Sequence, residues 1–96
     1  MIYSVSPALY EETVARLTEA VGSGSYFSGS VVFPFAGTEC RLTTSVVVYR
    51  ERRSQPEGPS DDIADLVPVW WEFHTTGDEG ECPNDFSFAE LRLYLR

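Results

Sequence analysis

Glu72 and His74 are the residues whose types and spacing best suit acid and base chemistry. They stand two apart in the stretch LVPVWWEFHTT (residues 66–76), so on a strand they would share a face about 7 Å apart. A carboxylate at that distance can orient an imidazole as a proton acceptor. A catalytic pair also needs a nucleophile or metal and a pocket, and His74 is the only histidine in the chain. Two interpretations stay open: a small hydrolase or metal-dependent site, or an exposed histidine beside a glutamate.

Charged residues gather in three other places. The acidic groups are Asp61, Asp62 and Asp65 in one segment, and Asp78, Glu79 and Glu81 in another; the basic group is Arg50, Arg52 and Arg53. Carboxylate oxygens could collect a hard cation, but neither acidic group has the pattern of a calcium-binding loop. The arginines could hold an anion. We expect all three groups to be solvated charge and predict no metal and no cofactor.

The composition excludes several enzyme classes. All seven basic residues are arginine, so the chain has no lysine for a Schiff base, a pyridoxal phosphate anchor or a phosphate-binding loop. Cys40 and Cys82 are far apart and lack metal-ligand spacing, which indicates reduced thiols, or a disulfide if the protein is exported.

The net charge of −8 indicates which partners to expect. A strongly acidic chain repels a phosphate backbone, so we expect no nucleic-acid binding. No run of residues approaches the roughly eighteen apolar residues of a membrane-spanning helix, and the first residues lack the pattern of a signal peptide. The sequence therefore predicts a soluble cytoplasmic domain that does not bind membranes.

The first half of the chain predicts a helix followed by a β-hairpin. Residues 6–24 begin with a capping serine and a proline and end in glycines, and an apolar stripe runs along them. Residues 25–35 and 40–53 are rich in β-branched and aromatic residues, with a turn at 36–38. Pro34 indicates an edge strand or a bulge.

The second half predicts a loop, a strand and a tail. Residues 51–65 are polar and contain two prolines, so we expect a mobile loop, with one helical turn at 61–65. In the next stretch, alternation places Val67, Val69, Trp71 and Phe73 on the core face and Trp70 on the other. The tail has the spacing of a capping box at Ser87, which predicts a helix, although alternating leucines leave a strand open.

One face of this predicted sheet could be a binding surface. If the strands are neighbours, an apolar and aromatic patch with a polar rim lies away from the first helix, as in many interfaces. The predicted interface residues are Val32, Val47, Tyr49, Trp70, Glu72 and His74. The alternative is that the C-terminal helix covers this face.

Three segments of the chain carry a resemblance. The stretches YFSGSVVF, VPVWWEFHT and NDFSFAEL resemble parts of small, acidic, uncharacterised bacterial proteins associated with mobile genetic elements. The resemblance implies a bacterial cytosolic setting and gives no residue a role.

The sequence thus predicts one α+β domain over residues 1–96. We expect an N-terminal helix packed on a three-stranded antiparallel sheet, closed by a short C-terminal helix or by a fourth strand. The expected function is a non-enzymatic accessory or protein-interaction module, a homodimer or small adaptor that uses the Trp70 face. The alternatives are an acidic inhibitor that imitates nucleic acid and binds a DNA-binding protein, and a small enzyme around Glu72 and His74.

Overall fold

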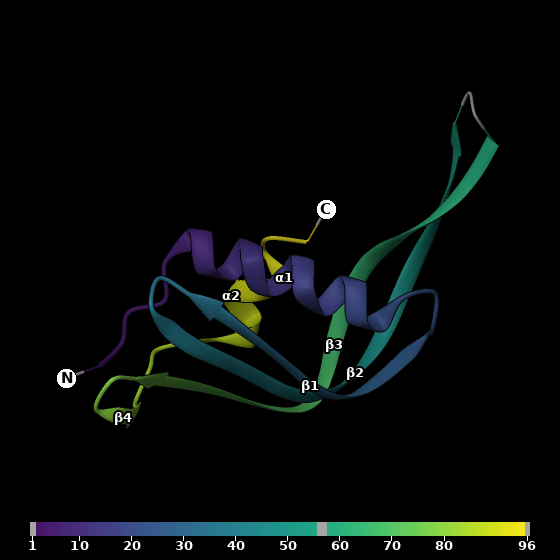
Figure 1. Cartoon of the computed structure of the whole chain (residues 1–96). Helices are drawn as coiled ribbons and strands as arrows, with labels where there is room; N and C mark the ends of the chain where they lie inside the picture. Colours follow the sequence, from purple (N-terminus) through teal and green to yellow (C-terminus); the bar gives the residue numbers. More distant parts are fainter. Residues whose placement is uncertain (1, 56–57, 96) are drawn as a thin grey trace.

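Two helices pack against one face of an antiparallel sheet, as Figure 1 shows. The computed structural model describes the backbone of residues 2–55 and 58–95 and the side chains of residues 2–51 and 63–95. The elements follow in the order α1 (Pro7–Val21), β1 (Tyr26–Phe35), β2 (Thr38–Gln55), β3 (Gly58–Gly77), β4 (Gly80–Cys82) and α2 (Phe88–Arg92). The predicted α+β fold with an N-terminal helix and a short C-terminal helix is therefore confirmed.

Helix α1 begins and ends where its capping residues predict. The Ser6 hydroxyl accepts a hydrogen bond from the Leu9 amide at 3.2 Å, and Pro7 occupies the first turn. Gly22 ends the helix with a φ of 61°, a conformation that glycine adopts without steric cost. The Arg50 guanidinium donates to the carbonyl oxygens of Gly22 and Gly24 and so fixes the chain beyond the helix to β2.

The sheet has the strand order β1-β2-β3-β4, with every neighbouring pair antiparallel. A two-residue turn joins β1 to β2, and both of its residues, Ala36 and Gly37, have positive φ as such tight hairpins require. Strand β1 is an edge strand, which is where Pro34 is tolerated. The fourth strand comes from residues 80–82 and not from the C-terminal tail.

The core lies between the two helices and the inner face of the sheet. Alternate residues of β2 form its centre, and Leu42, Thr44, Val46 and Val48 are all buried. An aromatic cluster extends this core toward α2: the rings of Phe73 and Phe86 stack with centroids 4.1 Å apart. Such ring pairs contribute about 0.5–1.5 kcal/mol beyond their buried area.

The predicted loop at residues 51–65 is wrong. Residues 51–55 belong to β2 and residues 58–65 to β3. A register shift lies between the pairs Tyr49–Asp65 and Arg50–Ile63, and from Arg50 the two strands pair in one register up to Gln55 opposite Gly58. Residues 56–57 lie outside the described residues. The two strands extend beyond the body of the domain as a two-stranded arm, which gives the molecule a length of 50 Å against 25 and 18 Å (Figure 1). The helical turn predicted at 61–65 is also absent, because this segment is strand.

The prediction that Val67 and Val69 of β3 lie on the core face is wrong. Ser45 pairs with Trp70 but Val46 pairs with Pro68, so Val69 is an extra residue in a β-bulge. The bulge reverses the alternation, which places Val67 on the outer face and leaves Val69 67% exposed. Leu66 is fully buried, although the sequence did not indicate it.

The C-terminal helix is confirmed, but its predicted cap differs. Ser87 precedes α2 without a side-chain capping bond; instead its amide donates to the Tyr10 hydroxyl at 3.1 Å. Arg92 forms a double hydrogen bond to the Asp65 carboxylate, which ties the helix to β3. Helix α2 therefore joins the inner layer beside α1 and does not cover the opposite face of the sheet (Figure 1).

The N-terminal segment closes the domain next to β4. The Tyr3 amide donates to the Pro83 carbonyl oxygen at 2.8 Å, and the Asp85 amide donates to the Tyr3 carbonyl oxygen.

In the part of the chain that the structure describes, neither helix has the length and apolar character needed to cross a membrane.

Candidate functional site

The outer face of the sheet, opposite the helices, is the candidate site. The pairing register divides it into rows of residues from β1, β2 and β3, and the rows run Tyr26–Val47–Val67, Ser28–Ser45–Trp70, Ser30–Thr43–Glu72, Val32–Arg41–His74 and Pro34–Glu39–Thr76. Tyr49 lies beyond the first row, and Glu81 of β4 lies beside Thr76. Side chains that share a row are cross-strand neighbours.

One half of this face is aromatic and uncharged. We define the aromatic half as Tyr26, Val47, Tyr49, Val67 and Trp70. Its three aromatic side chains are about half exposed, with 56% for Tyr26, 55% for Tyr49 and 46% for Trp70. No helix of the described structure covers them, so these rings contact solvent in the monomer.

The two tryptophans lie on opposite faces, as predicted. Trp71 shares the inner face with Phe73, and its ring meets Phe86 edge to face at 5.4 Å between centroids. It is nevertheless 38% exposed, because it lies at the margin of the core beside α2. Trp71 therefore lies on the predicted core face but is only partly buried.

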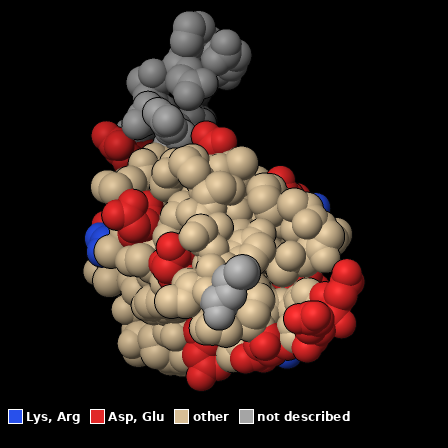
Figure 2. Space-filling view, turned by 90° about the vertical axis from the view of Figure 1, so that its left-hand side faces the viewer, with Lys and Arg blue, Asp and Glu red and all other residues tan. Residues whose placement is uncertain are grey.

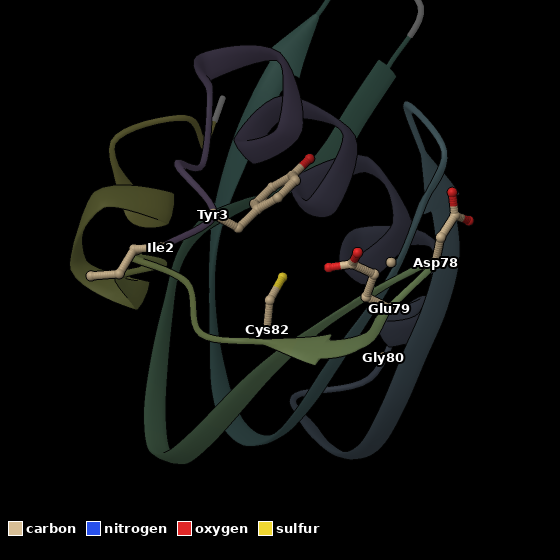
Figure 3. A pocket seen from close by; sticks show the side chains of 7 residues that line it. Ile2, Tyr3, Asp78, Glu79, Gly80 and Cys82 are labelled. Atoms are coloured by element: carbon tan, nitrogen blue, oxygen red, sulfur yellow. The ribbon is translucent and has the colours of Figure 1, made fainter.

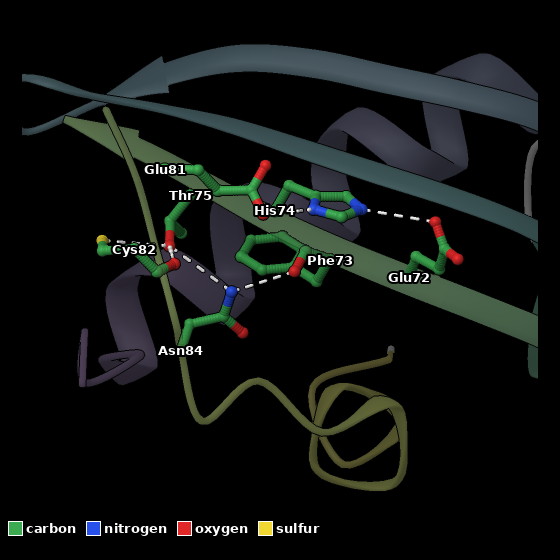
Figure 4. Close-up of polar contacts among 7 residues, drawn as sticks. All are labelled: Glu72, Phe73, His74, Thr75, Glu81, Cys82 and Asn84. Atoms are coloured by element: carbon green, nitrogen blue, oxygen red, sulfur yellow. Dashed lines mark hydrogen bonds and ion pairs between the residues drawn. The ribbon is translucent and has the colours of Figure 1, made fainter.

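The other half of the face is polar and centres on His74. Its ring Nε2 lies 3.3 Å from Glu72 Oε2, and its Nδ1 lies 3.3 Å from Glu81 Oε2 (Figure 4). Carboxylates only accept hydrogen bonds, so an imidazole that satisfies both must carry both protons. Accordingly, the hydrogen bonds that His74 donates to Glu72 and then to Glu81 raise its pKa above the ordinary value.

This arrangement favours an ion pair over acid and base catalysis. Both ring nitrogens of His74 are engaged by carboxylates, and the hollow beside them, about 140 Å³ in volume, is lined by charged and threonine side chains. In the described residues, no group of three or more histidine, cysteine, aspartate or glutamate side chains has the geometry of a metal site.

A second polar network lies on the inner face of the same strands. The Thr75 hydroxyl donates to the Cys82 carbonyl oxygen at 2.9 Å, and the Asn84 side-chain amide donates to the Phe73 carbonyl oxygen at 2.9 Å (Figure 4). Both bonds tie β4 and the following segment to β3. We assign this network a structural role.

A larger hollow of about 410 Å³ opens between the N-terminal segment and the β3–β4 turn (Figure 3). Ile2, Tyr3 and Cys82 line one part of it, and Asp78 and Glu79 line another. Both cysteines are free thiols. The Cys82 sulfur lies 3.5 Å from the Thr75 hydroxyl, which cannot activate it as a base, and burial raises the pKa of Cys40 to about 11.

Three of the charged residues singled out in the sequence have partners within the described part of the chain. Asp65 pairs with Arg92, whose hydrogen bond lowers the pKa of the aspartate, and Glu81 contacts His74. Arg50 is engaged by backbone carbonyl groups. The side chains of Asp61, Asp62, Arg52 and Arg53 lie outside the described residues.

The structure brings together only part of the predicted interface. Val47, Tyr49 and Trp70 belong to the aromatic half, whereas Glu72 borders it and Val32 and His74 lie two rows away. Tyr26 and Val67 were missed. Alternation along residues 26–35 could have placed Tyr26 on the outer face, but Val67 could not be placed without knowledge of the bulge.

Comparison with known proteins gives no further information about the site. No protein-family model, curated protein or solved structure matches the chain. The function of this chain must therefore be inferred from its fold and its surface.

Proposed function

We propose that this chain is a non-enzymatic protein-interaction module that self-associates through the aromatic half of its outer sheet face. The observation that carries the proposal is three half-exposed aromatic rings on neighbouring strands of the outer sheet face. Aromatic residues are enriched at interfaces and dominate their binding energy. Engagement of both His74 nitrogens by carboxylates supports a function other than catalysis.

Charge supports a second copy as the partner. The chain carries a net charge of −8, so two copies repel one another across most of their surfaces. The aromatic half contains no charged residue, and the carboxylate opposite Tyr49, Asp65, is already paired with Arg92. Two copies related by a two-fold axis would therefore meet where their repulsion is least.

The size of the face indicates a reversible contact. Ten residues of β1 at about 3.3 Å each, and three strands about 4.8 Å apart, give about 500 Å² for the whole outer face, of which the aromatic half is only one part. Stable complexes bury about 800 Å² on each partner. We therefore expect an association that depends on protein concentration.

The distribution of acidic side chains on the end of the molecule in Figure 2 does not favour the acidic inhibitor as a second candidate. On the end of the molecule in Figure 2, acidic side chains lie around the margin and uncharged surface occupies the middle. A protein that imitates nucleic acid would instead need carboxylates in a row at about the spacing of phosphates.

Light scattering coupled to size exclusion tests the proposal. The mass of the native protein should rise with concentration above that of one 10.8 kDa chain. Trp70→Glu should weaken this association about tenfold or more, because it buries a charge at the interface. Leu93→Glu is the matched control, since Leu93 is also a large exposed apolar residue but lies beyond α2, away from the outer face.

The proposal is contradicted if Trp70→Glu associates as strongly as the native protein. It is also contradicted if the folded native protein stays monomeric up to millimolar concentration. Circular dichroism of each variant confirms that the chains are folded.

A further inference from the structure

The free edge of β1 presents an ordered set of unpaired backbone groups. The Val48 amide donates to the Ser25 carbonyl oxygen at 2.8 Å, and Ser25 lies opposite Val48, one step before the pair Tyr26–Val47. In an antiparallel ladder, opposite residues exchange hydrogen bonds at every second position. The amides of Phe27, Gly29, Val31 and Phe33 therefore point toward β2, and those of Tyr26, Ser28, Ser30 and Val32 point away from the sheet.

The hydrogen bonds and the exposure agree with this assignment. Outside the ladder of the sheet, none of the hydrogen bonds of the described residues is donated by the four outward amides. Their residues are all exposed. Pro34 belongs to the same alternate set of residues, so its backbone nitrogen, which has no proton, faces the free edge. There it costs no hydrogen bond to β2.

This edge lacks the protection that most edge strands have. Natural edges are usually short, or carry charged side chains or bulges that prevent pairing with another chain. Strand β1 has ten residues, none of them charged, and pairs with β2 without a register shift. Only Pro34, near one end, interrupts its row of free amides.

We infer that β1 pairs antiparallel with β1 of a second copy, about a two-fold axis at Gly29. In this register Tyr26 lies opposite Val32 of the second copy, and Ser28 lies opposite Ser30. Each of the four outward amides then meets an outward carbonyl group. A register shifted by one pair toward the C-terminal end would place Tyr26 opposite Pro34, which has no proton to donate.

The side chains and charges of the strand suit this pairing. On the outer face, the proposed register places the half-exposed Tyr26 of one copy beside the half-exposed Val32 of the other, which makes an aromatic and β-branched pair. At the two-fold axis it places glycine opposite glycine, so no side chains meet there. Because β1 is uncharged, two strongly acidic copies can approach along this edge as they can at the aromatic half.

The edge contact shares Tyr26 with the aromatic half but does not involve Trp70. The outer face alone is smaller than a stable interface requires, and the edge would supply main-chain hydrogen bonds that the face lacks. With both contacts, the native protein would form assemblies larger than a dimer, and each contact could be removed separately.

Amide hydrogen exchange in the Trp70→Glu variant tests the edge contact. In dilute protein, the amides of Tyr26, Ser28, Ser30 and Val32 should exchange fast, and the alternate amides of β1 should exchange slowly. At concentrations where the mass doubles, the outward amides should slow about tenfold or more, because the pairing removes them from water. If they exchange equally fast at both concentrations, the edge contact does not form.

Ser30→Pro, made in the same Trp70→Glu background, removes one outward amide and should leave a folded monomer. The control is Ser30→Ala, which keeps the amide but also loses the hydroxyl contact to Thr43 at 2.8 Å, and should still dimerise. Dimers of the Ser30→Pro chain would overturn the inference. If the Trp70→Glu variant is monomeric at every concentration, the edge contact does not form, and the proposal for the Trp70 face is unaffected. If the Ser30→Pro single variant is monomeric, the Trp70 face does not associate, and the inference about the edge is unaffected.

Discussion

Trp70 and Trp71 are adjacent in the chain but contribute to different properties. Trp70 lies on the outer face beside Ser45, and Trp71 packs on Phe86 and Phe88 at the margin of the core. Trp71→Ala should lower the free energy of unfolding by about 2 kcal/mol, less than a fully buried tryptophan would, because Trp71 is partly exposed. Trp70→Ala should change it by about 0.5 kcal/mol or less in dilute protein.

Urea denaturation of the two variants at a concentration where the protein is monomeric measures this difference. Equal losses of stability from both substitutions would mean that Trp70 is also packed within the monomer. That result would contradict the assignment of the outer face as a free surface.

His74 gives the folded state a defined dependence on pH. Its pKa is raised by Glu72 and then Glu81, so the folded state binds the proton more tightly than the unfolded state, whose value is about 6.5. The stabilisation is complete below pH 6.5 and is lost as the pH rises through the folded pKa. Its size should be below about 1 kcal/mol, because all three side chains are substantially exposed.

A nuclear magnetic resonance titration of the single imidazole checks this prediction. The midpoint should lie above pH 6.5, and Glu72→Gln and Glu81→Gln should each lower it. The native protein should also lose its stability advantage over His74→Gln as the pH rises from 6 to 8.5. A midpoint at or below 6.5 would show that the ion pairs do not form.

At the scale of elements, the bulge at Val69 determines which face the neighbouring residues of β3 occupy. The pairs on either side of Val69 are Ser45–Trp70 and Val46–Pro68, so deletion of Val69 would leave every other pair in register. We expect the deletion variant to fold with the same core, at a cost of about 1–3 kcal/mol from lost bending of the strand. Deletion of Phe73 lacks this compensation and should prevent folding.

Thermal unfolding and amide exchange of the two deletion variants test the role of the bulge. Retained slow exchange of β2 amides in the Val69 deletion would agree with an unchanged register. If the two deletions are equally damaging, Val69 is not an extra residue.

The elements also show what sequence patterns can and cannot predict. Helix α1 was predictable because its cap, its apolar stripe and its terminal glycine are all local signals. The arm of β2 and β3 was not, because a two-stranded ribbon that projects into solvent has no buried face to impose alternation. Its register places Arg52 opposite Asp61, and this pairing cannot be read from either segment separately.

The same limit applies to the candidate site. Trp70, Val47 and Tyr49 could be grouped from alternation within single strands, whereas the separation of Val32 from Trp70 depends on how β1 aligns with β2 and β3. The role of Glu81 was hidden for the same reason, since it reaches His74 only through the pairing of β4 with β3.

At the scale of the whole molecule, charge and surface pattern favour association of like chains. A net charge of −8 keeps most of the surface repulsive, and two described regions without charge are the aromatic half and the β1 edge. We therefore expect added salt to strengthen association modestly, because it screens the repulsion between the acidic surfaces. Weaker association at high salt, measured by sedimentation, would indicate ion pairs at the interface instead.

Acrylamide quenching of Trp70 fluorescence in a Trp71→Phe variant tests the central claim most directly. Trp70 is then the only tryptophan, and it is 46% exposed in the monomer. If the chain associates through the aromatic half, quenching should be strong in dilute protein and should weaken in step with the rise in mass. If the mass rises while quenching stays constant, the copies meet elsewhere and the Trp70 face is not their interface.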